Sequence, residues 1–374
     1  MKNILFYFVF SSLLIYSCSD SNSIPETDQR SGDNSDNPTD DNDGTGGGND
    51  DVSNTNTWLI DKSLVFDGGP GKDGIPALIN PELITVSQDN YLLDDDLVIG
   101  LKHGDKVIAY PHKILDWHEI INADIDDLSI AITYCPLTGT AVGWDRNINN
   151  TKTTFGVSGL LYKNNLIPYD RLTDSNWSQL KLECVNGKLI GNKPETTVLP
   201  EMKWGLWKKI YPQTKVVSTN TGFQRTYSRY PYGDYKSNNQ YFIFPVDPIQ
   251  NNIPAKERVH TIIKNDVAKV YRFQNLDNGK VIIDTFQNQK FLIVGNHDFI
   301  LSFQLDETTN TLEFKYDFND TEIILSDNEG NTWNLFGEAI SGPKKGTFLK
   351  PAESSMMAYY FSIEAFYTDP IIYN

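Results

Sequence analysis

The stretch 128–144, LSIAITYCPLTGTAVGW, decides the fold class of the chain. Its two arms, 128–134 and 140–144, are rich in β-branched and aromatic residues, which favour a pleated, half-buried strand. Cys135 closes the first arm, and turn-forming residues follow it before the second arm begins. The stretch therefore predicts two successive β-strands joined by a short turn.

The same pattern recurs along most of the chain, with Gly, Asn or Asp at the turns between the segments. Because such segments are numerous and helical periodicity is rare, the sequence predicts a mainly β fold, between all-β and α+β. We expect one large multi-stranded β domain with a few short helices. The further predicted strands are 97–101, 107–110, 153–157, 215–219, 259–264, 269–273, 281–286, 291–294, 299–305, 311–316 and 322–325.

Two segments, 112–121 and 204–211, have helical periodicity. In the first, apolar residues and one histidine recur at three- and four-residue steps and would share a helix face. The second ends before Pro212. The segment 228–256, rich in Tyr, Asn and Pro, is expected to be a long connection that either covers a site or divides the domain. The residues of the shared face are Ile114, Leu115, His118 and Ile121.

Residues 1–17 have the organisation of a signal peptide, with Lys2, an apolar run 4–16 and the small Ser17 directly before Cys18. This run is shorter than the roughly 20 apolar residues that a membrane span needs. Its end resembles the lipoprotein box of bacterial lipoproteins, which implies that Cys18 is lipidated and anchors the protein in the membrane of the cell envelope, facing the periplasm or the outer surface. A plain secretory signal is the alternative.

Residues 18–57 are expected to be a flexible linker behind the lipidated cysteine, because they offer almost nothing to bury. From residue 19 onward, ten acidic residues against the single Arg30 give this linker a charge of -9 out of the chain's -17. The remaining residues, 58–374, are predicted to form the β-rich globular domain. The negative charge argues against a nucleic-acid partner.

Cys135 and Cys184 remain once Cys18 is set aside, and in an exported protein such a pair can form a disulfide. Their contexts differ, because Cys135 closes an apolar strand whereas Cys184 lies in the polar stretch 181–188. We therefore expect Cys135 to be a free thiol. It is then either a small core residue or a reactive thiolate.

His118 is the candidate partner of Cys135, because the helix that carries it leads into the strand that ends at Cys135. An imidazole beside a thiol can take its proton and leave a nucleophilic thiolate, and a third group then orients the imidazole. A histidine on an apolar helix face is also commonly a buried core residue. The candidate orienting groups are Glu119, Asp116 and Asn122.

A resemblance strengthens this site. The strings Tyr110-Pro111, 116–122 (DWHEIIN), 132–141 (ITYCPLTGTA) and 155–162 (FGVSGLLY) resemble the hallmark of a bacterial family of exported proteins classed as domain of unknown function 3179, and similar residues follow in order over about 97–373. The resemblance implies that one constellation recurs in the family, without assigning it a reaction. That constellation comprises His118, Glu119, Cys135, Arg146, Ser158, Asp170, Arg171 and Trp177.

Several of these residues have a structural and a functional interpretation. Asp170 and Arg171 form either an ion pair that fixes a turn or, through Arg171, a clamp for an anionic ligand. Ser158 is more typical of a tight turn than of a nucleophile, because the Gly-x-Ser-x-Gly pattern is absent. Trp177 is expected to line the core or a pocket. Arg146 joins Ser158, Asp170, Arg171 and Trp177 as a candidate ligand-binding residue.

Three functions remain at this point. The first is thiol-dependent acyl transfer or redox chemistry with Cys135 as nucleophile, His118 as base and Glu119 or Asn122 as orienting group. The second is a non-catalytic envelope protein that binds a glycan or another small molecule, with the Tyr-rich segment 227–241 gripping it. The third is a metal site that combines Cys135 and His118 with His112, His260 or Glu119. The sequence identifies neither a cofactor, a particular metal nor an oligomeric state.

Overall fold

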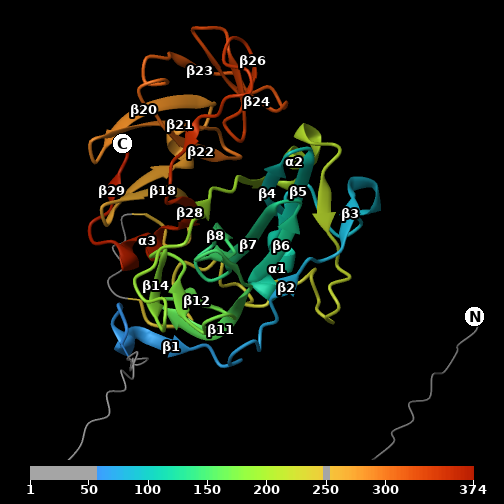
Figure 1. Cartoon of the computed structure of the whole chain (residues 1–374), viewed down its shortest axis with the longest axis vertical. Coiled ribbons are helices and arrows are strands. Elements are labelled where there is room, and N and C mark those ends of the chain that lie inside the picture. Colours follow the sequence, from blue (N-terminus) through green and yellow to red (C-terminus); the bar gives the residue numbers. More distant parts are fainter. Residues whose placement is uncertain (1–56, 247–252) are drawn as a thin grey trace, which may run out of the picture. The chain divides into compact units, whose positions relative to one another are not determined.

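The computed structural model describes residues 57–246 and 253–374, all within one unit of the chain, Val52–Asn374. The predicted signal peptide, Cys18 and nearly all of the predicted linker lie outside the described residues. The mainly β prediction is confirmed, since strands in several sheets make up most of the ordered elements and the helices are short (Figure 1). In the described part of the chain, no helix combines the length and the apolar character needed to cross a membrane.

The hairpin predicted from residues 128–144 lies at the centre of one sheet. Strand β7 (Leu128–Cys135) pairs antiparallel with β8 (Thr140–Asp145), from Ile130 opposite Asp145 to Cys135 opposite Thr140. On the other side β7 pairs with β6 (Ile120–Ile125). The sheet has the order β15-β8-β7-β6-β2, and its edge strands are β15 (Thr196–Thr197) and β2 (Leu78–Ile79).

Two further sheets flank this one. The first has the order β16-β4-β5-β17-β3 and the second the order β1-β11-β12-β13-β14. The strands of the first are β16 (Glu201–Lys203), β4 (Leu97–His103), β5 (Lys106–Pro111), β17 (Lys215–Val217) and β3 (Leu83–Thr85). The strands of the second are β1 (Val65–Asp67), β11 (Phe155–Tyr162), β12 (Asn165–Asp170), β13 (Asn176–Ser178) and β14 (Glu183–Asn186). A short pair, β9 (Asn147–Ile148) and β10 (Thr151–Lys152), extends beyond β8.

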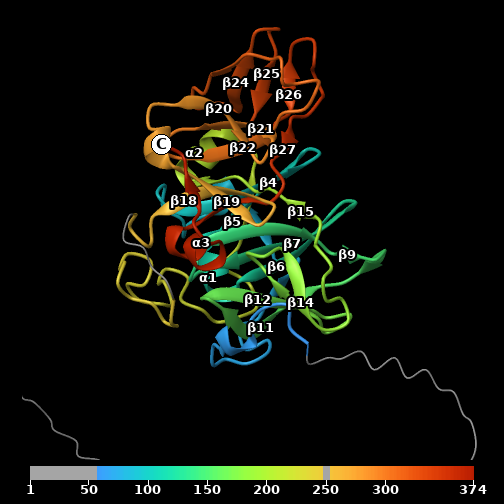
Figure 2. The ribbon, with the colours of Figure 1, turned by 90° about the vertical axis from the view of Figure 1, so that its left-hand side faces the viewer.

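The C-terminal third of the chain adds three four-stranded sheets, of which the last two lie at the far end from β1 and β11 (Figures 1 and 2). The first contains β28 (Ser355–Tyr359), β18 (Arg258–Lys264), β19 (Val267–Arg272) and β29 (Ile371–Ile372). The second contains β20 (Lys280–Phe286), β21 (Gln289–Gly295), β22 (Ile300–Gln304) and β27 (Lys350–Pro351). The third contains β23 (Phe314–Tyr316), β24 (Ile323–Asp327), β25 (Thr332–Asn334) and β26 (Ala339–Ser341).

Each strand predicted from the sequence overlaps a strand of the structure. Tight hairpins explain this agreement, because Lys163-Asn164, Asn265-Asp266 and Gln287-Asn288 each place two successive residues at positive φ. Such pairs match the twist of the flanking strands, and Asn and Asp tolerate the conformation well. The polar turn residues that separate the predicted segments therefore also fix their register.

The predicted helix 112–121 is shorter in the structure, where α1 spans His112–His118. Glu119 adopts φ 56° and its N–H bonds to the carbonyl of Leu115, which closes the last turn. Ile120 then begins strand β6, and Ile120 and Ile121 face different core clusters as strand residues do. The helical spacing of Ile121 was therefore a coincidence with the alternation of a strand.

The second predicted helix is confirmed as α2 (Trp204–Ile210), with the N–H of Tyr211 closing it onto Trp207. A third helix, α3 (Tyr360–Phe366), was not predicted and directly follows β28. Short 3₁₀ turns occupy Lys62–Leu64, Val86–Gln88 and Phe273–Asn275. The predicted connection 228–256 contains no helix or strand in its described residues.

Candidate ligand-binding site

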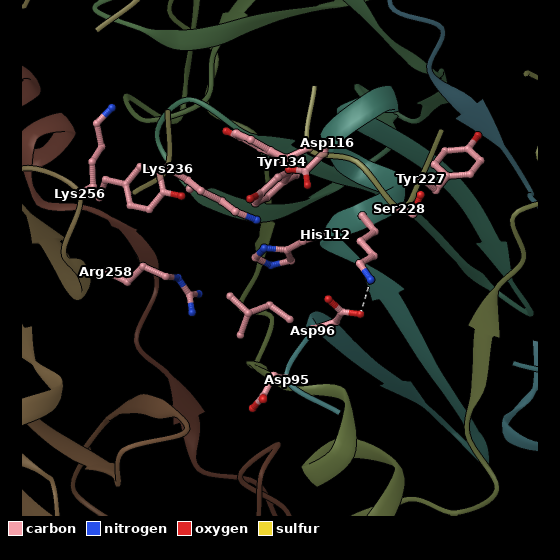
Figure 3. Close-up of a pocket in the computed structure, with 15 residues that line it drawn as sticks. Asp95, Asp96, His112, Asp116, Tyr134, Tyr227, Ser228, Lys236, Lys256 and Arg258 are labelled. Atoms are coloured by element: carbon pink, nitrogen blue, oxygen red, sulfur yellow. Dashed lines mark ion pairs between the residues drawn. The ribbon is translucent and has the colours of Figure 1, made fainter. Parts of the chain in front are cut away.

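A cavity of about 340 Å³ lies beside α1, the end of β7 and the start of β18 (Figure 3). Part of its wall comes from the Tyr-rich connection, so this segment covers a pocket. Several of its charged side chains approach one another although they are far apart in the sequence. The lining residues are Asp95, Asp96, Leu97, His112, Lys113, Asp116, Tyr134, Gly139, Tyr227, Ser228, Tyr230, Lys236, Lys256, Arg258 and Tyr359.

Helix α1 places His112 and Asp116 together on the cavity wall. The two residues are four positions apart, which puts their side chains on one face of a helix. Pro111 precedes the helix in extended conformation, as suits a proline at a helix start. Ile114 and Leu115 pack into the core cluster that the sheet of β7 shares with the sheet of β4. This packing fixes the rotation of the helix.

His112 is held by a buried carboxylate. Its Nε2 lies 2.8 Å from Oε2 of Glu201, a residue of β16 whose side chain is 1% exposed. Arg258, the first residue of β18, donates from Nη2 to the same oxygen at 2.9 Å. Burial lowers the pKa of His112, against the opposing effect of Glu201. The neutral ring then donates through Nε2, which leaves Nδ1 as a hydrogen-bond acceptor.

Two cationic groups of the cavity retain bonding capacity. The Nε of Arg258 is buried and makes no hydrogen bond within the described residues. Lys236, from the Tyr-rich connection, lies 4.7 Å from the ring centre of Tyr230 and forms no ion pair with any described residue. Figure 3 shows both side chains extending toward His112. By contrast, Lys113 is paired with Asp96 at 2.6 Å.

Asp116 is the unpaired acid of the cavity. It is 6% exposed, and its carboxyl group makes no hydrogen bond or ion pair in the described part of the chain. Burial raises its pKa to about 7, against the smaller opposing effect of Lys236. The side chain can therefore carry or release a proton near neutral pH.

Aromatic side chains enclose the cavity. Tyr134 packs against His112 with ring centres 4.5 Å apart and the rings tilted by 45°, and Tyr359 is packed against the turn that joins β7 and β8. Gly139 in this turn has φ 59°, and a Cβ there would lie 3.0 Å from the ring of Tyr359. The sequence after Cys135 therefore needs a glycine at this position both for the turn and for the cavity wall.

Cys135 does not reach this cavity. Its thiol is 1% exposed and donates to the carbonyl of Asn164 at 3.4 Å. Burial, and secondly the nearby Glu119, raises the pKa of Cys135 to about 11. Such a thiol stays protonated at neutral pH, whereas a nucleophilic cysteine needs a lowered pKa.

His118 is engaged elsewhere. Its Nδ1 lies 2.7 Å from the carbonyl of Pro76 and its Nε2 lies 2.7 Å from the hydroxyl of Tyr227, so neither nitrogen bonds Cys135. Successive strand residues point to opposite faces, and Tyr134 packs on the face that carries α1. Cys135 points to the other face and joins a different core cluster. The structure therefore does not bring the predicted thiol and imidazole into hydrogen-bond contact.

Glu119 and Asn122 have separate environments. Glu119 is buried, accepts a hydrogen bond from the Tyr232 hydroxyl at 3.4 Å and lines a second, mostly apolar cavity of about 220 Å³. Burial raises its pKa to about 7. Asn122 bonds both backbone groups of Phe155. Its Nδ2 donates to the Phe155 carbonyl at 2.9 Å, and its Oδ1 accepts from the Phe155 N–H at 2.8 Å. Asn122 therefore ties β6 to β11 and does not orient His118.

The remaining predicted site residues make internal contacts and line neither cavity. Arg171 pairs with Asp73 at 2.6 Å and donates to the carbonyl of Phe155. Asp170 accepts from Trp177 Nε1 at 3.0 Å and from Thr173. Arg146 pairs with Asp124, and Ser158 donates to the carbonyl of Ile167. The predicted ion pair between Asp170 and Arg171 does not form, because Arg171 is paired with Asp73, and Ser158 lies within strand β11 and not in a tight turn. Trp177 lies in the core, which is one of the two places predicted for it.

The two described cysteines are free and buried. Cys184 donates to the carbonyl of Asn186 at 3.4 Å and forms no disulfide with Cys135. Among residues 57–246 and 253–374, no group of three His, Cys, Asp or Glu side chains is arranged to hold a metal ion. His260, a residue considered for such a site, bonds the hydroxyl of Ser302 through Nε2.

The cavity residues of α1 have other roles in the prediction from sequence, His112 as a metal ligand and Asp116 as an orienting group for His118. Their i, i+4 spacing in one helix indicates a shared face. Glu201, Lys236 and Arg258 carried no signal, because only the tertiary fold brings them to α1.

A family model described as "Protein of unknown function (DUF3179)" matches residues 72–370. A search of curated proteins found no significant match, and neither did a search of solved structures. The matched range contains the whole lining of the cavity beside α1, the strings 116–122 and 132–141, and the residues of the predicted constellation. It contains the second cavity except for Gly68 and Pro70. Because the match covers most of its length, the chain belongs to the DUF3179 family of proteins of unknown function.

Proposed function

We propose that this protein binds a small anionic ligand, of the carboxylate class, in the cavity beside α1. The observation that carries the proposal is the guanidinium of Arg258, which lines the cavity and whose Nη1 makes no hydrogen bond to a described residue. A guanidinium with free donors prefers planar carboxylates.

Charge supports the same conclusion. The chain as a whole is acidic, with a net charge of -17. In the cavity, however, Lys236 and Arg258 extend toward one point, and Arg258 is oriented by Glu201. An oriented guanidinium and a nearby ammonium in a half-enclosed site favour an anion over water.

A binding function fits this protein better than thiol chemistry. Cys135 is buried with a raised pKa, and His118 has both nitrogens engaged in other hydrogen bonds. The cavity, by contrast, has polar groups with free bonding capacity within aromatic walls, which is typical of small-molecule sites. Of the functions considered from the sequence, the envelope binding protein is therefore the one we propose.

We also propose that the domain works at the cell envelope, tethered through lipid on Cys18 and a flexible acidic linker. The support comes from the sequence alone: a short apolar leader, Ser17 before Cys18, and ten acids in residues 19–57. Metabolic labelling with a radioactive fatty acid should mark the wild-type chain and not a Cys18→Ala variant. Label retained in the variant would contradict the anchor.

Isothermal titration calorimetry on the purified full chain tests the ligand class. Monocarboxylates should bind, and the corresponding neutral amides should bind at least 10-fold more weakly. Arg258→Gln should also weaken carboxylate binding at least 10-fold, which corresponds to about 1.4 kcal/mol of binding free energy. Lys209→Gln, which removes an exposed pair with Asp320 at 2.6 Å, is the matched control. Equal binding of acids and amides would refute the proposal.

A further inference from the structure

The part of the cavity wall that carries Asp116 favours a positively charged group. Asp116 is more than nine-tenths buried, faces the cavity and has no hydrogen bond or ion pair within the described residues. Burying an ionised carboxylate without a partner is expensive. Either the group keeps a proton or a cation from outside the chain compensates it.

His112 provides a second acceptor beside it. Because Nε2 is directed at Glu201, the neutral ring presents Nδ1 as an acceptor, and Nδ1 has no hydrogen bond to any described residue. The helix spacing of four residues keeps this nitrogen and the Asp116 carboxylate on one wall. Two acceptors held in this way suit a primary ammonium group, which has three donors.

Resting on the function proposed above, we propose that the ligand is a small zwitterion, with its carboxylate at Arg258 and Lys236 and its primary ammonium at Asp116 and His112. The class includes free amino acids and short molecules with the same two groups. The volume of about 340 Å³ suits a ligand of this size. The unpaired Asp116 also disfavours a dicarboxylate, because a second carboxylate would face it directly.

An alternative cation for the Asp116 carboxylate is the ammonium group of Lys236. It acts on the carboxyl group through its charge, but it does not approach within the 4.0 Å of an ion pair. Lys236 is exposed and belongs to a segment without helix or strand, so its ammonium could serve as the internal cation. A Lys236→Met variant separates the two cases.

Calorimetric titration of the full chain with three probes of matched skeleton tests the inference: norvaline, in both enantiomers, pentanoate and pentylamine. We expect the better norvaline enantiomer to bind at least 10-fold more tightly than pentanoate. Asp116→Asn should remove this advantage and leave pentanoate affinity within about twofold. Arg258→Gln should weaken norvaline and pentanoate alike.

The outcomes distinguish this inference from the proposed function. Pentanoate binding equal to norvaline binding, or an advantage of norvaline that survives in Asp116→Asn, would overturn the zwitterion and keep the anion site. No binding of either acid would overturn both. In Lys236→Met both acids should bind more weakly while the advantage of norvaline persists, because Lys236 contacts the carboxylate that the two probes share. Norvaline affinity that rises there would make Lys236 the internal cation of Asp116 and overturn its place at the carboxylate, and loss of the norvaline advantage would overturn the assignment of the ammonium to Asp116. Unfolding curves of each variant report whether it folds.

Discussion

Glu119 combines two unfavourable features at one position. Its backbone has φ 56°, a left-handed conformation that costs a residue with a Cβ roughly 1 to 2 kcal/mol, and its carboxyl group is buried. The backbone conformation of Glu119 ends helix α1 and lets strand β6 begin at Ile120, so this residue changes the direction of the chain beside the cavity. The buried carboxyl group of the same residue lines the second cavity. Strained positions of this kind concentrate at functional sites.

The raised pKa of Glu119 predicts a pH-dependent stability. Its folded pKa of about 7 lies above the ordinary value of 4.5, so between these pH values the folded state binds more protons than the unfolded state. Stability therefore falls as pH rises through this window. Glu119→Gln should be as stable as the wild type at pH 4 and more stable by roughly 3 kcal/mol at pH 8, since each pKa unit corresponds to about 1.4 kcal/mol.

Urea unfolding at pH 4, 6 and 8 measures this difference. Glu307→Gln, which changes an exposed glutamate, is the matched control and should show no such divergence. A Glu119→Gln variant that runs parallel to the wild type at all three pH values would mean that the carboxyl group is not desolvated.

Cys135 should behave as an unreactive thiol. In a Cys18→Ala, Cys184→Ser background it is the single remaining cysteine of the three in the chain. Because its pKa is raised to about 11, iodoacetamide labelling at pH 7.5 should be at least about 100-fold slower in the native protein than in urea. Adding His118→Ala should leave the native rate unchanged. Fast native labelling that depends on His118 would restore the thiol-imidazole pair.

The turn between β7 and β8 shows what an element contributes to the site. Gly139 serves two purposes there, a positive φ and room for the ring of Tyr359. Gly104, in the hairpin between β4 and β5, also has a positive φ of 55°, but no atom lies within 4 Å of a Cβ built on it. Substitutions at the two glycines therefore separate the energetic cost of backbone strain from the cost of close packing.

Alanine at the two positions should therefore differ in effect. Gly104→Ala should cost roughly 1 to 2 kcal/mol of unfolding free energy, the strain of a left-handed alanine. Gly139→Ala should cost more and should also weaken ligand binding, because Tyr359 must move in the cavity wall. Chemical unfolding together with calorimetry measures both quantities. Equal destabilisation with intact binding in Gly139→Ala would show that Tyr359 yields freely.

Elements were more predictable than their contacts. Local signals, namely β-branched residues and Asn, Asp or Gly turns, were sufficient for the strands and for α2. The prediction extends the first helix to Ile121 because Ile121 fits both a helical and a strand period, and only the conformation of Glu119 decides between them. The pairing of His118 with Cys135 failed because chain proximity does not determine which face of a strand a side chain takes. The network of Glu201, His112 and Arg258 depends on the tertiary fold alone.

At the scale of the whole described domain, the core clusters connect sheets that are distant in sequence. One cluster joins Trp207 of α2 to Phe299, which directly precedes β22, and to Trp333 of β25. Another joins Cys135 of the central sheet to Trp177 and to Val259 of β18. Gly100 in β4 accommodates the indole of Trp207, since a Cβ there would lie 2.1 Å from the ring. The sheets are therefore held by shared packing, and we expect them to unfold together.

This continuity predicts one cooperative transition. Urea unfolding followed by circular dichroism and by tryptophan fluorescence should give coincident curves, as two-state behaviour requires. Trp207→Ala should lower the stability of the whole domain by about 3 to 5 kcal/mol, the usual cost of removing a buried tryptophan, while the curves stay coincident. Ile371→Ala, which shortens a partly exposed side chain in β29, is the control and should cost far less. Two separated transitions, with the sheets of β20–β26 melting first, would instead identify the C-terminal sheets as a domain of their own and would confine the effect of Trp207→Ala to its boundary.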